Sequence, residues 1–252
     1  MAELSRDSGF AKAILAGAHP DAVVLWPGAP VVAGTPGLRR LLAALPADSL
    51  QLTWQPLGIE LSRDSSRGIT WGIALASASR NPEIGNYISA WRRDGARWSI
   101  AALVFAGMGG IPRPLLRAGI SLSRKPIKAS GSRGPFVAAD LAFARLAGDS
   151  GAAAAFEHWA APDAVTFGDR GLLTRGPKDI GRAVDFPAVW RWHPVAAGAA
   201  GSGDLGWTVG EATIAAREAE PTYSKYLTAW VRGEGGTTRF LTDGGNGRPA
   251  PR

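Results

Sequence analysis

Two sets of four segments read as β-strands, one set in each half of the chain, and in segments such as 224–232 the side chains of two faces alternate. A period of two is typical of β-strands, whose successive side chains point to opposite faces of a sheet. Gly, Asp and Ser cluster between the segments, as at Asp94-Gly95, and favour hairpin turns. The predicted strands cover 52–60, 69–76, 86–92 and 97–105 in the first half, and 190–196, 207–215, 224–232 and 238–242 in the second.

A helical region precedes each set of strands. It opens near Phe10 in the first half and near Phe143 in the second, and it passes through a short strand to a second helix. The short strands are expected at 23–25 and 165–167, and the second helices at 36–45 and 177–184, each with Pro in its first turn. Helices followed by a meander of strands predict an α+β fold with an antiparallel sheet in each half.

The two halves are copies of one another. Four motifs recur in the same order: P-D-A-V at 20–23 and 162–165, W-x-P at 54–56 and 192–194, G-x-T-x-G at 68–72 and 206–210, and Y-x-x-x-W at 87–91 and 226–230. Their offsets drift by only a few residues, as expected when insertions fall in loops. We therefore predict a first domain at 1–110, a basic, proline-containing linker at 111–134, and a second domain at 135–252.

This set of motifs resembles the nuclear transport factor 2-like superfamily, and within it the SnoaL-like and ketosteroid isomerase-like branch. The resemblance implies two cones, each with helices inside a strongly curved, cystatin-like sheet and a pocket at the open end. Members of the superfamily include isomerases, dehydratases, cyclases, hydrolases and binding proteins without catalysis, so the resemblance implies a fold and not a reaction. Members commonly associate through their sheets, which implies an intramolecular pseudo-dimer here.

The two copies are unequal in their helical regions. Phe10 lies 10 residues before Pro20, whereas Phe143 lies 19 residues before Pro162, so the first copy is expected to lack about nine residues of the pocket wall. The final strand of the first copy, 100–105, is almost wholly apolar. We therefore expect a working site in the second copy only.

Three residues of the second copy are candidates for catalysis. Asp140 is followed by apolar residues and could act as a general base with a raised pKa, or it could interact with the dipole of its helix, as Asp7 would in the first copy. His193 could titrate near neutral pH, or it could be a partly buried structural residue beside Trp192. Asp243 could bind or deprotonate a substrate at the pocket rim, or it could cap a turn.

Further residues are candidates for ligand binding. Alternation places Tyr226, Thr228 and Trp230 on one strand face and Lys225, Leu227 and Ala229 on the other. Tyr226 could donate a hydrogen bond to a developing oxyanion, although Tyr87 occupies the same place in the first copy. Trp159, Trp192 and Trp230 could line an apolar pocket or belong to the core. Trp190 and Trp192 lie on the strand face opposite His193, and only one face can look into the cone.

The charge of the chain is concentrated in the linker. The net charge is +7, and six of the basic residues lie between Ile111 and Arg133 with no acidic residue among them. This pattern favours a solvated tether, so nucleic-acid binding is not expected, and docking of an acidic partner by the linker is the weaker alternative.

There is no cysteine, the three histidines are far apart, and phosphate- or dinucleotide-binding motifs are absent, so neither a metal nor a cofactor is expected.

These observations favour a protein that holds a hydrophobic small molecule. No apolar run approaches the ~20 residues of a membrane helix, and the first 18 residues do not resemble a signal peptide, so a cytoplasmic protein is expected. The predicted function is a cofactor-free isomerase or lyase, or a binder of an apolar carbonyl compound, with its site in the second domain. The alternative is a non-catalytic module that self-associates through its sheet faces.

Overall fold

The computed structural model describes residues 9–45, 51–77, 83–106, 133–167, 173–233 and 235–251. The first domain contains helices α2 (Phe10–Gly17) and α3 (Gly34–Ala43) and strands β1 (Ala18–Leu25), β2 (Val32–Ala33), β3 (Gln51–Leu61), β4 (Arg67–Ser77), β5 (Glu83–Asp94) and β6 (Arg97–Ala106). The second contains helices α4 (Gly134–Ser150), α5 (Ala152–Trp159) and α6 (Pro177–Ala183) and strands β7 (Ala160–Phe167), β8 (Leu173–Arg175), β9 (Ala188–Ala199), β10 (Leu205–Ala216), β11 (Thr222–Arg232) and β12 (Thr238–Gly247). Except for Arg133 and Gly134, the predicted linker lies outside the described residues.

Each domain is built on one six-stranded sheet, and the two sheets have the same topology. The strand orders are β2-β1-β6-β5-β4-β3 and β8-β7-β12-β11-β10-β9. The α+β prediction is confirmed, with one difference in strand direction. The pairs β1–β6 and β7–β12 are parallel, because the last strand of each meander returns beside the first strand in the same direction. The remaining pairs are antiparallel.

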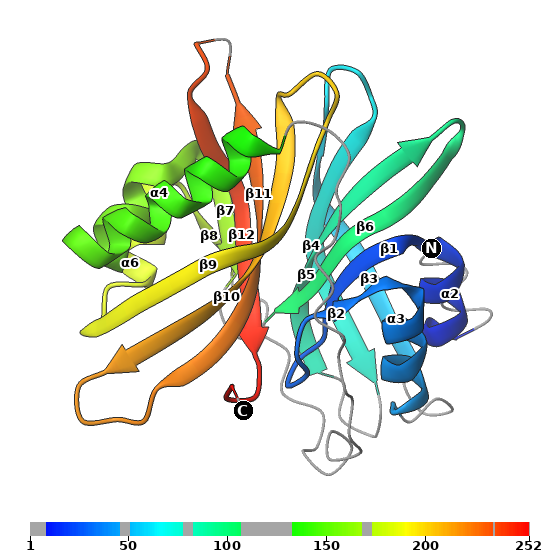
Figure 1. Cartoon of the computed structure of the whole chain (residues 1–252), viewed down its shortest axis with the longest axis horizontal. Coiled ribbons are helices and arrows are strands. Elements are labelled where there is room, and N and C mark those ends of the chain that lie inside the picture. Colours follow the sequence, from blue (N-terminus) through cyan, green and yellow to red (C-terminus); the bar gives the residue numbers. More distant parts are fainter. Residues whose placement is uncertain are drawn as a thin grey trace.

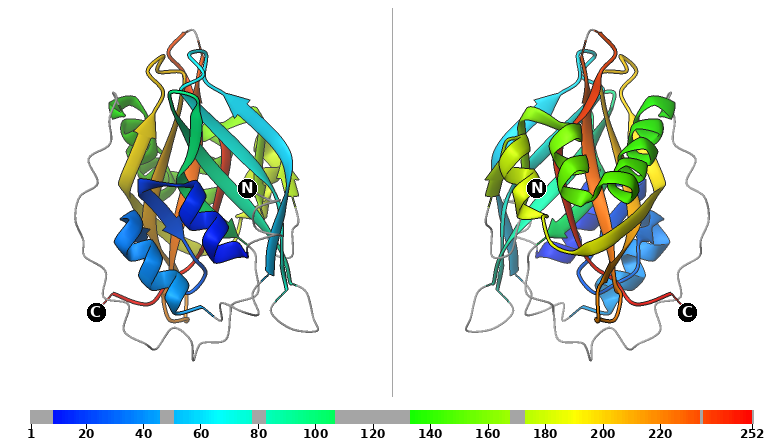
Figure 2. Two further views of the ribbon diagram at one scale, coloured as in Figure 1. Left: turned by 90° about the vertical axis from the view of Figure 1, so that its right-hand side faces the viewer. Right: turned by 90° about the vertical axis from the view of Figure 1, so that its left-hand side faces the viewer.

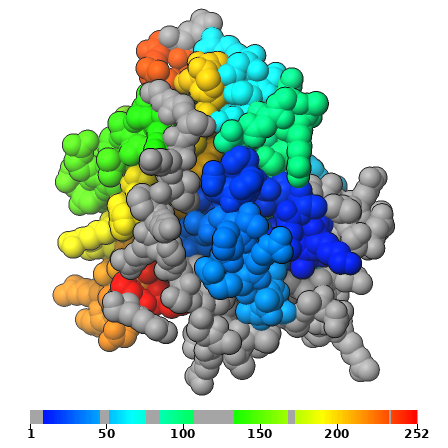
Figure 3. Space-filling model, turned by 45° about the vertical axis from the view of Figure 1, so that its right-hand side comes forward, coloured from blue at the N-terminus to red at the C-terminus, as the bar shows by residue number. Residues whose placement is uncertain are grey.

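The helices cover the outer faces of the two sheets, and the sheets lie back to back between them (Figure 1). The views from the two sides show α2 and α3 over the first sheet and α4, α5 and α6 over the second (Figure 2). Helices α2 and α3 lie next to each other on the outer surface of the first domain (Figure 3). Beneath the helices, each domain has its own apolar core, which includes Phe10, Ile14 and Phe105 in the first and Phe143 and Phe240 in the second.

Helix α2 is the counterpart of α5, not of α4. Gly9 precedes α2 with a φ of 82°, and Gly151 precedes α5 with a φ of 87°, angles that favour glycine. Both glycines follow Asp-Ser and lie 142 residues apart, the same offset as the P-D-A-V motifs. The alignment of Phe10 with Phe143 was therefore wrong. Asp7 aligns with Asp149, and the helix that carries Asp140 has no counterpart among the described residues of the first domain.

An apolar layer joins the inner faces of the two sheets. It contains Val23, Ile69, Ile88 and Val104 from the first domain and Trp207, Val209, Leu227 and Ala229 from the second. Burial of this surface stabilises the contact, because removal of apolar area from water contributes roughly 25 cal/mol per Å². A pseudo-dimer would require such a contact, and that arrangement of the two cones stays a prediction.

Two turns at one end of the sheets bind each other reciprocally. The Asp64 carboxylate, between β3 and β4, accepts a hydrogen bond of 2.8 Å from the backbone N–H of Ser202, between β9 and β10. In return, the Asp204 carboxylate accepts one of 3.0 Å from the backbone N–H of Arg63. Each domain thus supplies an aspartate that caps the turn of the other. Among the described residues, no helix is both long and apolar enough to cross a membrane.

Candidate functional site

Strand β11 presents its polar and aromatic residues to the helices of the second domain. Tyr226 and Trp230 face α4, because Tyr226 bonds to Asp140 of that helix and Trp230 packs against Phe143. Leu227 and Ala229 face the first domain. The alternation predicted from the sequence is confirmed, and the side with Tyr226, Thr228 and Trp230 is the inside of the cone.

The Asp140 carboxylate is the centre of a buried hydrogen-bond network. The Tyr226 hydroxyl lies 3.0 Å from each of its oxygens, and the Trp192 Nε1–H donates to Oδ1 at 2.9 Å. Thr208 also hydrogen-bonds the carboxylate. The Thr208 hydroxyl in turn accepts a bond of 2.8 Å from the Trp230 Nε1–H, which leaves its own proton free for Asp140. Asp140 itself is fully buried.

The G-x-T-x-G motif makes this network sterically possible. A Cβ atom at Gly210 would overlap the ring and hydroxyl of Tyr226, and one at Gly206 would overlap the ring of Phe136 in α4. Thr208, between them, is the residue that the sequence reasoning missed. It was visible as part of the repeated motif, but nothing in the motif showed that its hydroxyl would reach a carboxylate.

Asp243 lies on the same face of the sheet as Thr228, its direct partner on β11. The Thr228 hydroxyl donates a short hydrogen bond to Asp243 Oδ2. Unlike Asp140, which is fully buried, Asp243 is half-buried. Among the predicted catalytic residues, Asp140 and Asp243 are the two that the fold brings into the same cone.

The environment of the two carboxyl groups raises their pKa values. Burial raises the pKa of Asp140 to about 6, although hydrogen bonds from Thr208, Tyr226 and Trp192 oppose the change. Burial raises the pKa of Asp243 to about 7, opposed by the bond from Thr228 and assisted by the charge of Asp140. Burial and the neighbouring Asp140 raise the pKa of Tyr226 well above 10. Asp243 therefore changes its charge near neutral pH, while Tyr226 stays protonated.

Aromatic side chains fill the cone around this network. The Phe143 ring lies 4.8 Å from Trp192, 6.3 Å from Trp230 and 6.3 Å from Trp159, measured between centroids. The Arg239 guanidinium lies 5.8 Å from the Trp159 ring centroid, within the range of a cation–π contact. Trp230 is fully buried, whereas Trp159 and Trp192 are half-buried. The aromatic residues predicted as pocket lining thus also form the core.

His193 lies apart from the carboxyl groups. On β9, Trp190 and Trp192 are half-buried against the helical core, and His193 is exposed on the opposite face. The placement of His193 in the site was wrong, because the helices cover the tryptophan face of β9. The charge of His193 contributes slightly to lowering the pKa of Asp140, but the side chain does not point into the cone.

The described part of the first domain keeps the frame of the site without its carboxyl groups. Trp91 Nε1–H donates to Thr70 at 2.9 Å, as Trp230 does to Thr208. Ser89 pairs with Leu103 across β5 and β6, where the second domain pairs Thr228 with Asp243. A small cavity in the first cone is lined by apolar and hydroxyl side chains, namely Trp54, Tyr87, Ser89, Trp91, Ile100, Leu103 and Phe105.

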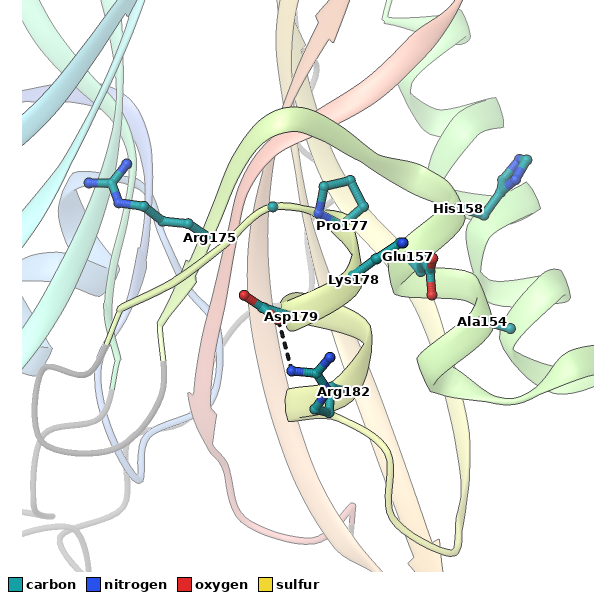
Figure 4. A pocket seen from close by; sticks show the side chains of 9 residues that line it. Ala154, Glu157, His158, Arg175, Pro177, Lys178, Asp179 and Arg182 are labelled. Atoms are coloured by element: carbon teal, nitrogen blue, oxygen red, sulfur yellow. Dashed lines mark hydrogen bonds and ion pairs between the residues drawn. The ribbon is translucent and has the colours of Figure 1, made fainter.

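An open groove on the second domain is separate from this site. It lies between α5 and α6 and includes Glu157, Arg175, Lys178 and Arg182 in its lining (Figure 4). Asp179 and Arg182 form an ion pair of 2.9 Å within it. None of the predicted site residues lines the groove.

No protein-family model and no curated protein sequence matches this chain. Several solved structures are similar to it over less than half of its length. A ketosteroid isomerase-like protein from Erwinia carotovora atroseptica is 12% identical over 41% of this chain and 85% of that chain, with a TM-score of 0.35. An NTF2-like protein with a cystatin-like fold from Novosphingobium aromaticivorans is 15% identical over 46% of this chain and 80% of that chain, with a TM-score of 0.39. An epoxide hydrolase of the LEH-like type from Mycobacterium tuberculosis is 11% identical over 47% and 81%, with a TM-score of 0.35. The names of the first two include the fold terms that the sequence motifs led us to expect, and each of the three matches covers about as many residues as one domain.

Proposed function

We propose that the second domain is a small-molecule pocket protein that binds an apolar carbonyl compound and transfers a proton on it without a cofactor. The observation that carries this proposal is the difference between the copies. Both keep the Thr–Trp hydrogen bond of the frame, but among the described residues only the second places two carboxyl groups with raised pKa values in its cone. Strongly perturbed carboxyl groups concentrate at functional sites.

Asp243 is the residue that we assign to proton transfer. A carboxyl group with a pKa of about 7 is half protonated at neutral pH, so it can accept a proton from carbon and return it elsewhere. Its partial exposure leaves a side on which a ligand could lie. Asp140 assists by raising the pKa of Asp243 through its own charge.

Tyr226 has a different role in this proposal from the one its sequence position suggested. A phenol has one O–H, and that of Tyr226 is directed at Asp140. It cannot donate at the same time to an oxyanion. We therefore assign Tyr226 to holding Asp140 in place, and the apolar rings of Trp159 and Trp192 to contact with the ligand.

Hydrogen–deuterium exchange at carbon tests the proposal directly. The probe is 2-tetralone, an apolar bicyclic ketone with exchangeable hydrogens next to its carbonyl, incubated with the full chain in D2O and followed by NMR. We expect exchange above the buffer rate, a loss of at least tenfold in Asp243→Asn, and no loss in Asp149→Asn, an exposed control. Exchange that is equal in wild type and Asp243→Asn would contradict the assignment.

A second candidate function is a non-catalytic association module. It is favoured by the close aromatic packing around Phe143 and by the full burial of Asp140, whose oxygens already have donors. The exchange experiment, combined with a titration of the protein with 2-tetralone, discriminates the two candidates. If 2-tetralone neither exchanges nor shifts the indole resonances of Trp159 and Trp192, the association module is the better description.

A further inference from the structure

Lys225 is a fully buried lysine at the contact between the two domains, outside the proposed site. It lies on β11 between Ser224 and Tyr226, and it points away from the cone toward the first domain. Its direct partner on β12 is Asn246. The counterpart of Lys225 in the first domain is Asn86, a neutral residue that is also fully buried. The lysine is therefore a feature of one copy and not of the repeated fold.

The Lys225 amine supports the residues that join the domains. Its Nζ donates to Asn246 Oδ1 and, at 2.9 Å, to the backbone carbonyl of Gly247. Asn246 Nδ2 in turn donates to the carbonyls of Leu25 at 2.9 Å and Phe105 at 2.7 Å, both in the first domain. The backbone N–H of Gly28 donates at 2.9 Å to the same Gly247 carbonyl. Lys225 thus bonds to the two residues, Asn246 and Gly247, that make three hydrogen bonds from the second domain to the first.

The charged groups around Lys225 do not neutralise an ammonium there. Glu211 lies opposite it on β10 and forms an ion pair of 3.3 Å with Arg248, which follows β12. Arg248 is itself a cation close to Lys225. The elements of the first domain that reach this place contribute backbone carbonyls and the Gly28 N–H. In the described part of the chain, no carboxylate lies within ion-pair distance of the amine.

The number of acceptors fits the neutral amine. A neutral lysine has two N–H donors, and the structure supplies two acceptors, Asn246 Oδ1 and the Gly247 carbonyl. A protonated lysine has three donors and a full charge, and burial of an unpaired charge costs several kcal/mol. The geometry of the contact therefore favours the uncharged form.

We propose that Lys225 is a pH-sensitive latch between the two domains, closed by its neutral amine and weakened when the amine is protonated. Burial, reinforced by Arg248 and opposed by Glu211, lowers the pKa of Lys225 to about 7. In the unfolded chain the lysine titrates near 10.5. Between these two values the folded state binds fewer protons than the unfolded state, so stability rises with pH. The latch closes as the pH rises through neutrality and loosens below it.

The titration of the Lys225 side chain in the intact wild-type protein is the first test. NMR of the 13Cε and 1Hε resonances across pH 5.5–11 is expected to show a midpoint near 7 for Lys225. Lys178, which is exposed, is the comparison residue in the same spectra. A midpoint near 10.5 for Lys225 would overturn the proposal, and this measurement does not depend on the folding of any variant.

Urea unfolding of variants of the full chain is the second test. Lys225→Met keeps the length of the side chain and removes its titration, and Lys178→Met is the matched control. The unfolding equilibrium constant of wild type and control is expected to fall, relative to Lys225→Met, by about tenfold per pH unit between pH 7.5 and 9.5. The protection of the Gly28 amide against hydrogen exchange is expected to fall below pH 7 in wild type and to lose that pH dependence in Lys225→Met. Parallel pH profiles for all three proteins would overturn the proposal.

Discussion

The Tyr226 hydroxyl lies 3.0 Å from both oxygens of the Asp140 carboxylate. This pair joins the middle of the meander to the long helix of the second domain across 86 residues of sequence. Both residues are buried, so neither can exchange its partner for water when the bond is removed. Loss of this hydrogen bond is therefore expected to reduce both the stability of the second domain and the proposed proton transfer.

Substitution of Tyr226 by Phe is expected to destabilise the protein by about 1–3 kcal/mol, because a buried carboxylate loses a donor that no water replaces. It should also raise the pKa of Asp140 further above its usual value, since the Tyr226 bond lowers that pKa. Urea unfolding gives the first quantity, and NMR of the carboxyl carbon gives the second. Tyr87→Phe is the matched control, because among the described contacts the Tyr87 hydroxyl makes no hydrogen bond to a carboxylate. Equal losses of unfolding free energy in the two variants would mean that the bond to the Asp140 carboxylate contributes nothing to stability.

The two raised carboxyl pKa values predict that stability falls with increasing pH between about 4 and 7. In this window the folded state keeps protons on Asp140 and Asp243 that the unfolded chain has released. The contribution of these two carboxyl groups to stability is therefore complete below pH 3.8, their pKa in the unfolded chain. It is lost as the pH rises through their pKa values in the folded state, about 6 and about 7.

Asp243→Asn should reduce this decline, because the amide does not titrate. The measurement is urea unfolding at pH 4.5, 6 and 7.5 for wild type, Asp243→Asn and Asp149→Asn. The window lies below that of Lys225, so the two titrations can be separated in the same data set. A decline that is as steep in Asp243→Asn as in wild type would show that Asp243 titrates normally.

The alternation along β11 was sufficient to predict which side chains share a face, because the two-residue period of a strand is independent of the rest of the fold. The proximity of Asp140 to Tyr226 could not be predicted in this way. It depends on how α4 crosses the sheet, and on glycine at 206 and 210 leaving room for Phe136 and Tyr226.

Two predictions, the placement of His193 and the alignment of Phe10 with Phe143, were wrong for physical reasons. His193 and Trp192 are neighbours on β9, so alternation states that they face opposite sides without stating which side the helices cover. The alignment of Phe10 with Phe143 failed because apolar residues recur every three or four positions in a helix, so several alignments satisfy the pattern. Gly151, with its positive φ, occurs once at the junction of α4 and α5 and is a better landmark.

The reciprocal turns predict a loss of stability in acid. Burial alone would raise the pKa of Asp64, but hydrogen bonds from Ser62, Ser66 and Ser202 outweigh it and lower the pKa well below 3.8. The pKa of Asp204 is lowered in the same sense, by Ser202 and Arg63 against the effect of burial. Lowered pKa values contribute stability that is present above pH 4 and lost as the pH falls further.

Asp64→Asn and Asp204→Asn should therefore each unfold less steeply with acid than wild type below pH 4, and be less stable than wild type above it. Circular dichroism between pH 5 and 2 measures the transition. Asp149→Asn, an exposed aspartate outside the turns, should follow the wild-type curve. If all three variants follow it, the turns contribute no net stability through these charges.

The Thr–Trp pair that both copies keep offers the sharpest comparison between the domains. In the second domain Thr208 accepts from Trp230, which is fully buried, and also bonds to Asp140. In the first, Thr70 accepts from Trp91, which is half-buried. Val has the shape of Thr without the hydroxyl, so each substitution removes the same acceptor.

Thr208→Val is expected to cost about 1–3 kcal/mol, because it leaves a buried indole N–H unpaired and takes a donor from a buried carboxylate. Thr70→Val should cost less, because Trp91 is less buried than Trp230 and, among the described contacts, its hydroxyl partner bonds to no buried carboxylate. Urea unfolding, combined with the indole resonances of the two tryptophans, measures both effects. Asp140 should also titrate at a higher pH in Thr208→Val and at an unchanged pH in Thr70→Val, because only Thr208 reaches the carboxylate. A larger loss from Thr70→Val would mean that the first cone, and not the second, depends on its polar network.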